Sequence, residues 1–150
     1  MKLLLDTYIE LWAVTDSPKL GAAARELIVA AENSIYVSAA SVWEIAIKYA
    51  LNVSSEGAGS VGNVGKAGNR AGRGDMPVSA ARAAELFALS DYQPQPIDWA
   101  HTQAVSALPT LKSHADPIDR LLIAQARCEA MMLLTRDSDV AEYGERVMLV

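Results

Sequence analysis

Five acidic residues fall where predicted strands end or predicted helices begin. They are Asp6, Glu44, Asp116, Asp119 and Asp137. The carboxyl ends of parallel strands gather functional groups at one edge of a sheet, so we expect these carboxylates to converge. With no lysine or arginine expected among them, they need a cation to offset their charge, and oxygen-only ligation selects Mg²⁺ or Mn²⁺. Such an ion supports phosphodiester hydrolysis by an activated water.

Each of these acids also has a purely structural interpretation. Asp6, Asp116 and Asp137 each precede a predicted helix and would serve as its N-cap. Asp119 falls in a first helical turn, where a negative charge favours the helix dipole. Glu44 would suit a solvent-facing helix surface. The metal hypothesis therefore depends on the joint placement of the five acids.

Short apolar strands that alternate with helices are expected to position these acids. The predicted strands are Lys2–Leu5, Ser34–Ser38, a short one at 96–97, 131–135 and 147–150. The predicted helices are 8–14, an alanine-rich one ending near Glu32, 41–51, 79–90, 98–108, 116–130 and 137–144. Ser38 or Ser41, Ser79, Asp98 and Asp116 are the expected N-caps, the last with Pro117 at the first helical position. This alternation favours an α/β fold around a mainly parallel sheet.

The stretch from Asn52 to Met76 differs in composition from the rest. It holds seven of the nine glycines and no aromatic residue, which predicts a flexible loop or linker. It also carries three basic residues, Lys66, Arg70 and Arg73. The 51 residues before it are too few to close a core alone, so we expect a single domain over residues 1–150.

Charge and residue usage exclude several other classes of protein. The formal net charge of −5 argues against a simple phosphate-neutralising nucleic-acid-binding module, although not against a nuclease that uses metal ions. The single cysteine, Cys128, leaves no intrachain disulfide. The spacing of His101 and His114 does not indicate zinc. The lack of a signal-peptide core or a membrane-length apolar run predicts a soluble cytoplasmic protein.

Five blocks of the sequence carry a resemblance when taken in order. They are "LLLDTYIELWA", "VSAASVWEIAIK", "MPVSAARAAEL", "DPIDRLLIAQAR" and "LLTRDSDVAEYG". They look like the successive blocks of the PIN-domain ribonucleases, most closely the VapC-type toxins of bacterial toxin–antitoxin modules. The resemblance covers nearly the whole chain outside 52–76. It implies an α/β/α sandwich with a mainly parallel central sheet of four or five short strands.

The same resemblance assigns roles to individual residues. It implies Asp6, Glu44, Asp119 and Asp137 as ligands of Mg²⁺ or Mn²⁺, with Asp116 assisting. It implies small polar supports or substrate contacts at Thr7, Ser38 and Thr135 and a reserve ligand at Asp139. Lys66, Arg70 and Arg73 are candidate RNA contacts in the loop, which departs from the family by being longer and richer in glycine. Position 8 is often histidine in such sequences and is Tyr8 here, which cannot act as a cation near neutral pH.

The function implied is that of a metal-dependent endoribonuclease, the toxin of a type II toxin–antitoxin system. Its partners would be an RNA substrate, a cognate antitoxin protein and a second copy of itself in a homodimer. Its products would carry a 5′-phosphate and a 3′-hydroxyl. The glycine-rich loop would contact RNA, contact the antitoxin or do neither. Two alternatives stay open: a degenerate PIN-like domain that binds without cutting, and a haloacid-dehalogenase-type phosphatase with Asp6 as its nucleophile.

Overall fold

A parallel sheet forms the centre of the domain. The computed structural model describes residues 1–57, 76–111 and 116–150. Within them the strands are β1 (Lys2–Leu5), β2 (Ser34–Ser38), β3 (Gln93–Gln95), β4 (Met132–Thr135) and β5 (Val147–Leu149). Their order is β3-β2-β1-β4-β5, and each neighbouring pair is parallel. The predicted α/β class and its parallel sheet are confirmed.

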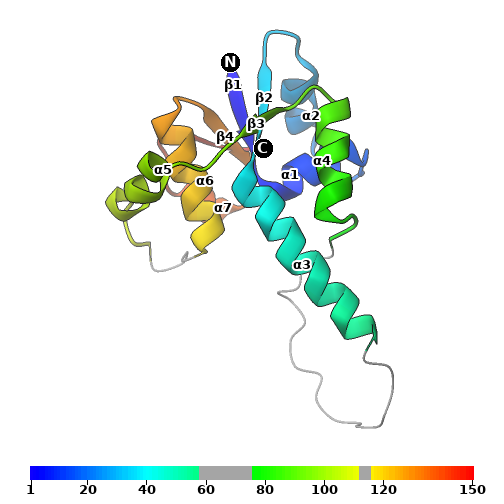
Figure 1. Ribbon diagram of the computed structural model, residues 1–150. Helices are drawn as coiled ribbons and strands as arrows, with labels where there is room; N and C mark the ends of the chain where they lie inside the picture. Colours follow the sequence, from blue (N-terminus) through cyan, green and yellow to red (C-terminus); the bar gives the residue numbers. More distant parts are fainter. Residues whose placement is uncertain (58–75, 112–115) are drawn as a thin grey trace.

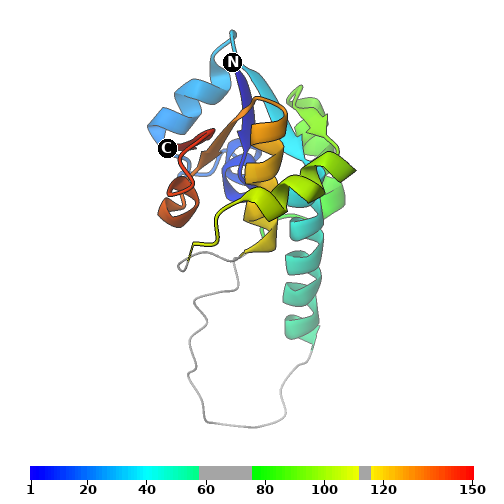
Figure 2. The same cartoon turned by 90° about the vertical axis from the view of Figure 1, so that its left-hand side faces the viewer.

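Helices cover both faces of this sheet. They are α1 (Thr7–Val14), α2 (Ala22–Val29), α3 (Ala39–Gly57), α4 (Ala80–Leu89), α5 (Trp99–Ala104), α6 (Pro117–Cys128) and α7 (Ser138–Ala141), with a 3₁₀ turn at Val105–Ala107. In Figures 1 and 2, α1, α2 and α4 lie on one side of the sheet, and α5 and α6 lie on the other. The far half of α3 projects beyond the body of the domain. The result is the expected α/β/α sandwich.

The central strands are apolar on both faces because both faces are covered. Leu4 and Leu133 pack with residues of α6. Leu3, Leu5 and Leu134 pack into a second cluster with residues of α1 and α2. Successive side chains of a strand point to opposite faces, so a run such as "KLLL" supplies both layers at once. Packing on two sides holds the carboxyl ends of β1 and β4 in place.

Side chains cap the helices at most of the expected positions. Ser79, Asp98, Asp116 and Asp137 each accept a hydrogen bond from a backbone N–H in the first turn of α4, α5, α6 and α7. Of the two serines considered for α3, Ser38 accepts from the backbone N–H of Ala40 at 2.9 Å. The starts of these five helices are therefore determined locally.

Among the elements that differ from the predicted boundaries, α3, α2 and β3 show the physical reasons most clearly. α3 continues to Gly57, six residues into the stretch expected to be a loop. α2 ends at Val29 rather than near residue 32, because the side chain of Asn33 donates to the carbonyl of Leu27 at 2.8 Å and closes the helix end. β3 lies at 93–95 rather than 96–97. Its Pro94 is tolerated because β3 is an edge strand, which within the described part of the chain pairs with β2 alone.

Several predictions concern residues that lie outside the described ranges. They are the loop over 58–75, its basic residues Lys66, Arg70 and Arg73, and His114. Among the helices of the described ranges, none has the length and apolar character that crossing a bilayer requires.

Candidate active site

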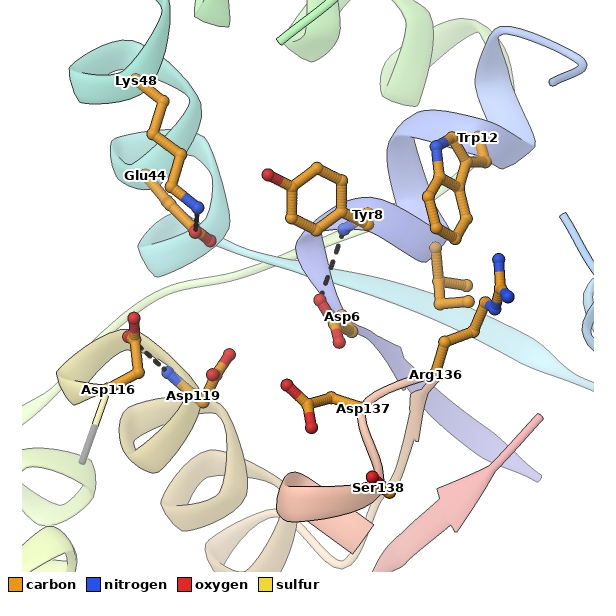
Figure 3. Close-up of a pocket in the computed structure, with 11 residues that line it drawn as sticks. Asp6, Tyr8, Trp12, Glu44, Lys48, Asp116, Asp119, Arg136, Asp137 and Ser138 are labelled. Carbon is orange, nitrogen blue, oxygen red and sulfur yellow. Dashed lines mark hydrogen bonds and ion pairs between the residues drawn. The ribbon is translucent and has the colours of Figure 1, made fainter. Parts of the chain in front are cut away.

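A polar cavity opens over the carboxyl ends of β1 and β4, where α1, α6 and α7 begin (Figure 3). Leu5 of β1 is paired with Leu134 of β4, so the residues that follow the two strands become neighbours. The cavity has a volume of about 480 Å³. Its lining comprises Asp6, Tyr8, Ile9, Trp12, Glu44, Lys48, Asp116, Asp119, Arg136, Asp137 and Ser138. The five acids selected from the sequence therefore line one pocket.

Asp6 is held by a hydroxyl from the neighbouring strand. The Thr135 hydroxyl donates to Asp6 Oδ2 at 2.6 Å, and the same oxygen of Thr135 accepts from the backbone N–H of Asp137 at 3.0 Å. The other carboxylate oxygen of Asp6 accepts from the backbone N–H of Tyr8. This relay fixes Asp6 and Asp137 relative to one another across two strand ends.

A second threonine fixes Glu44 in the same manner. The Thr7 hydroxyl donates to Glu44 Oε2 at 2.6 Å, and Lys48, one turn further along α3, forms an ion pair with Oε1. The expectation of a pocket without lysine or arginine is wrong, because Lys48 and Arg136 both line it. Lysine four residues after glutamate on a helix is a pairing that the sequence itself displays.

Three of the pocket acids cap helices and line the pocket at the same time. Asp6, Asp116 and Asp137 accept backbone N–H groups at the starts of α1, α6 and α7. Asp119 lies in the first turn of α6. Capping uses only part of a carboxylate, which offers about four acceptor sites. The structural and functional interpretations of these residues are therefore compatible.

Other residues with predicted roles lie behind the pocket or beside it. Thr7 and Thr135 are buried and act on the acids through the hydrogen bonds described above. Ser38 is fully buried, and its hydroxyl donates to Gln125 Oε1 at 2.6 Å. Asp139 donates its backbone N–H to Asp137 and is absent from the lining. Ser38 therefore joins the end of β2 to α6 and is absent from the pocket lining.

Burial and like charges raise the pKa of two carboxyl groups here. The pKa of Asp6 is raised from 3.8, mainly by burial and further by the charges of Glu44 and Asp137, although the hydrogen bond from Thr135 opposes the shift. The pKa of Glu10 is raised well above 4.5 by burial and by the charges of Asp6 and Glu44.

Glu10 is an acid that we did not single out from the sequence. It has no exposed surface, and among the described residues neither carboxylate oxygen has a hydrogen-bond partner. The nearby Ser41 hydroxyl lowers the pKa only in part. A glutamate within the otherwise apolar run "YIELWA" was the one available signal. It places a further carboxyl directly behind the pocket.

The donor set of the pocket fits a hard divalent cation. Five carboxylates line it against two cationic side chains, and a cation would offset both the burial of Asp6 and the mutual repulsion. Mg²⁺ keeps several waters and needs only one or two direct carboxylates. This suits pocket acids whose ligand atoms, among the described residues, do not gather in threes within 4.8 Å.

Three residues elsewhere do meet that distance criterion. Asp98, His101 and Glu129 place potential ligand atoms within 4.8 Å of one another. However, His101 Nδ1 accepts from the backbone N–H of Asp98 at 3.1 Å, so Nε2 carries the proton and donates to Glu129 at 3.0 Å. The backbone N–H of His101 donates to Asp98 in return. Neither ring nitrogen retains a free lone pair for a metal. Asp98 and His101 form a capping box, to which Glu129 adds a hydrogen bond, and the three residues are here called the capping box.

The fold and the pocket define a class: an α/β/α domain whose acidic pocket lies over the carboxyl ends of a parallel sheet. The chain belongs to the PIN domain family, whose model matches residues 3–146. PIN domains are generally nucleases, and membership places the chain in that broad class. A comparison with curated protein sequences gave no significant match.

Two solved structures share the fold. One is described as the crystal structure of VapBC2 from Rickettsia felis bound to a DNA fragment from their promoter. It has a TM-score of 0.58 and 15% identity over 100% of this chain and 98% of that chain. The other is described as a toxin–antitoxin complex from Klebsiella pneumoniae, with a TM-score of 0.53 and 15% identity over 97% of this chain and 95% of that chain. At this identity the likeness concerns the fold alone.

Proposed function

We propose that this chain is a Mg²⁺- or Mn²⁺-dependent endoribonuclease and the toxin of a toxin–antitoxin pair. The observation that carries the proposal is the charge imbalance of the pocket, five carboxylates against two cations. Because PIN domains are generally nucleases, the excess of carboxylates would serve to bind the metal ion of a nuclease. The two structures of the same fold come from toxin–antitoxin complexes, which supports the biological role.

Four acids would hold one or two ions, directly or through waters that the ions keep: Asp6, Glu44, Asp119 and Asp137, with Asp116 assisting at the border. When bound, the ion supplies activation of water and stabilisation of charge on the phosphate. Thr135 and Thr7 hold the carboxylates of Asp6 and Glu44 in fixed orientations, which a metal site requires of its supporting hydroxyls. The proton lost by the attacking water would pass to a carboxylate of the pocket or to solvent.

The test is RNA cleavage by the full chain in Mg²⁺, compared with Asp6→Asn. Asparagine retains the shape and one acceptor oxygen, so the fold is expected to persist and cleavage to be lost. Asp98→Asn is the matched control, because Asp98 caps α5 outside the pocket. Equal cleavage by wild type and Asp6→Asn would refute the assignment.

A second candidate, a binding domain without nuclease activity, is favoured by one observation. The ion pair between Lys48 and Glu44 occupies an acid that should hold metal. Mn²⁺ titration separates the two candidates. A nuclease should bind Mn²⁺ in a manner that depends on Asp6, whereas a degenerate site should bind it poorly in both wild type and variant.

The partners in this proposal are a cognate antitoxin and a second copy of the chain. An antitoxin would inhibit by covering the acidic pocket. Purification of the chain with the product of an adjacent small reading frame, followed by size-exclusion chromatography with light scattering, measures both associations. Loss of RNA cleavage in the complex and its recovery on antitoxin removal are the expected results.

A further inference from the structure

One wall of the pocket is aromatic. Tyr8 and Trp12 lie one turn apart on α1, and their ring centroids are 5.8 Å apart with the planes tilted by 37°. Both rings line the cavity and are half-buried. Figure 3 shows them on the side opposite Asp116 and Asp119, with Asp6 between the two walls.

A cationic side chain lies over each ring. Lys48 Nζ lies 5.2 Å from the centroid of Tyr8, and the guanidinium carbon of Arg136 lies 5.1 Å from that of Trp12. Arg136 is exposed, and its Nη1 donates to the carbonyl of Lys19 at 3.0 Å, which holds it at the mouth of the pocket. The four side chains form a row in the order Lys48, Tyr8, Trp12, Arg136, here called the aromatic row.

Core packing explains only part of this arrangement. Trp12 and Tyr8 do pack against buried clusters, but rings needed only for packing would be covered rather than left facing a polar cavity. Both cations in the pocket lining also belong to this row. Flat rings beside positive charges are the combination that binds single-stranded nucleic acid, because bases stack on the rings and phosphates meet the cations.

The charge of the chain restricts where phosphates can be held. The formal net charge is −5, so attraction to a polyanion must be local rather than spread over the surface. A duplex keeps its bases stacked inside and cannot offer them to Tyr8 or Trp12, whereas an unpaired segment can. The aromatic row would thereby select the form of RNA that reaches the acids.

We propose that the aromatic row is a base-stacking subsite, which receives an unpaired base of the RNA next to the scissile phosphate. Trp12 is its main platform, Tyr8 extends it, and Arg136 and Lys48 contact the flanking phosphates. Arg136 leaves the face of Trp12 as the base arrives. The proposal rests on the proposed ribonuclease function and names the residues that determine its preference for single strands.

The test measures RNA binding rather than cleavage. The full chain carrying Asp6→Asn is titrated, at fixed salt and with Mg²⁺, against a labelled single-stranded RNA of about eight nucleotides and against the same sequence as a duplex. Fluorescence anisotropy gives the two affinities. Trp12→Leu in this background is expected to weaken single-strand binding by about 5- to 100-fold, the loss of one stacked base. Duplex binding is expected to be weak and unchanged.

Matched variants separate stacking from general damage. Trp12→Phe keeps a ring and should lose less affinity than Trp12→Leu. Trp99→Leu, at a tryptophan that is 84% exposed and outside the pocket lining, should lose none. Arg136→Gln should weaken single-strand binding and reduce its salt dependence. Thermal unfolding of each variant checks the fold. If Trp12→Leu does not fold, the binding measurement on Arg136→Gln, a change at an exposed position, tests the proposal instead.

The subsite is overturned if folded Trp12→Leu and Arg136→Gln bind single strands as the parent does. Equal affinity of the parent for single strand and duplex, or no binding of either, also overturns it. Failure of the nuclease proposal gives a different result. In that case wild type does not cleave RNA and does not bind Mn²⁺ through Asp6, while single-strand binding still depends on Trp12.

Discussion

The acidic pocket and the capping box of Asp98, His101 and Glu129 both bring carboxylates together, yet they differ in how far the neighbouring groups satisfy them. In the capping box, both ring nitrogens and the backbone N–H of His101 are hydrogen-bonded, to Asp98 and to Glu129. In the pocket, five acids face two cations. The cluster with the shorter distances between potential ligand atoms is thus the one whose histidine already has both ring nitrogens hydrogen-bonded.

Short distances between potential ligand atoms are therefore a poor guide to a metal site. A histidine with both ring nitrogens hydrogen-bonded is fixed by its partners. Carboxylates that outnumber the cations beside them are held together by the fold against their mutual repulsion. The raised pKa of Asp6 is the measurable sign of that repulsion and burial. If the distinction is right, substitutions in the two clusters should affect different properties.

The largest difference is expected in catalysis. Asp6→Asn should reduce RNA cleavage by about 100-fold or more, because even loss of a group that merely orients a metal ligand costs roughly 10- to 100-fold. Asp98→Asn should leave the rate within about twofold, since asparagine caps a helix as well as aspartate does. Initial rates at saturating Mg²⁺ measure both. Similar losses in the two variants would erase the contrast between the clusters.

The next largest effect is expected in the affinity for metal. Thr135→Val removes the hydroxyl that donates to Asp6 and should weaken Mn²⁺ binding by about 10- to 100-fold. Thr102→Val is the control, because the Thr102 hydroxyl donates to the carbonyl of Trp99 outside the pocket. Isothermal titration calorimetry gives both constants. An unchanged Mn²⁺ affinity in Thr135→Val would show that the relay has no role in holding metal.

A substitution in the capping box should lower stability and leave metal affinity unchanged. His101→Ala removes a fully buried ring that bonds at both nitrogens and should lower the free energy of unfolding by about 2 kcal/mol. Mn²⁺ affinity should not change. Urea unfolding and calorimetry on the same protein give the two numbers. A fall in Mn²⁺ affinity without loss of stability would make the capping box a metal site after all.

The smallest effect concerns the dependence of stability on pH. Because the pKa of Glu10 in the folded protein is raised well above 4.5, folding favours its protonated form. Its contribution to stability is therefore fully present below about pH 4.5 and is lost as pH rises through the folded-state pKa. Glu10→Gln stays neutral, so it should gain stability relative to wild type as pH rises above 4.5. Metal-free urea unfolding from pH 4 to pH 8 tests this. A wild-type-minus-variant difference that does not change with pH would contradict it.

Much of the fold was predictable because it is determined by local chemistry. Apolar runs such as "KLLL" predict strands buried on both faces, and capping residues such as Ser79 and Asp116 mark helix starts without tertiary information. The extent of α3 was not predictable in this way, since a glycine-rich composition argues against a helix and the structure continues it to Gly57. Local signals predict how elements begin better than how far they run.

The pocket acids were predictable for the same reason, because strand ends place them. The other walls of the pocket were not. Which face of α1 turns toward the cavity depends on how the helix packs on the sheet, so the sequence did not indicate that Trp12 lines the pocket while Glu10 is buried behind it. Arg136 is likewise adjacent to Asp137 in sequence, but its position over Trp12 depends on the contact with Lys19.

Asp6, Asp116 and Asp137 are both helix N-caps and pocket carboxylates, which affects how an inactive form of this protein should be made. Each begins a helix, so replacement by alanine would remove a cap worth about 1 kcal/mol as well as a ligand. Three such changes together would confuse loss of chemistry with partial unfolding. Asparagine at the same positions separates the two, and an inactive variant made in that way should stay folded well enough to trap partners and RNA intact.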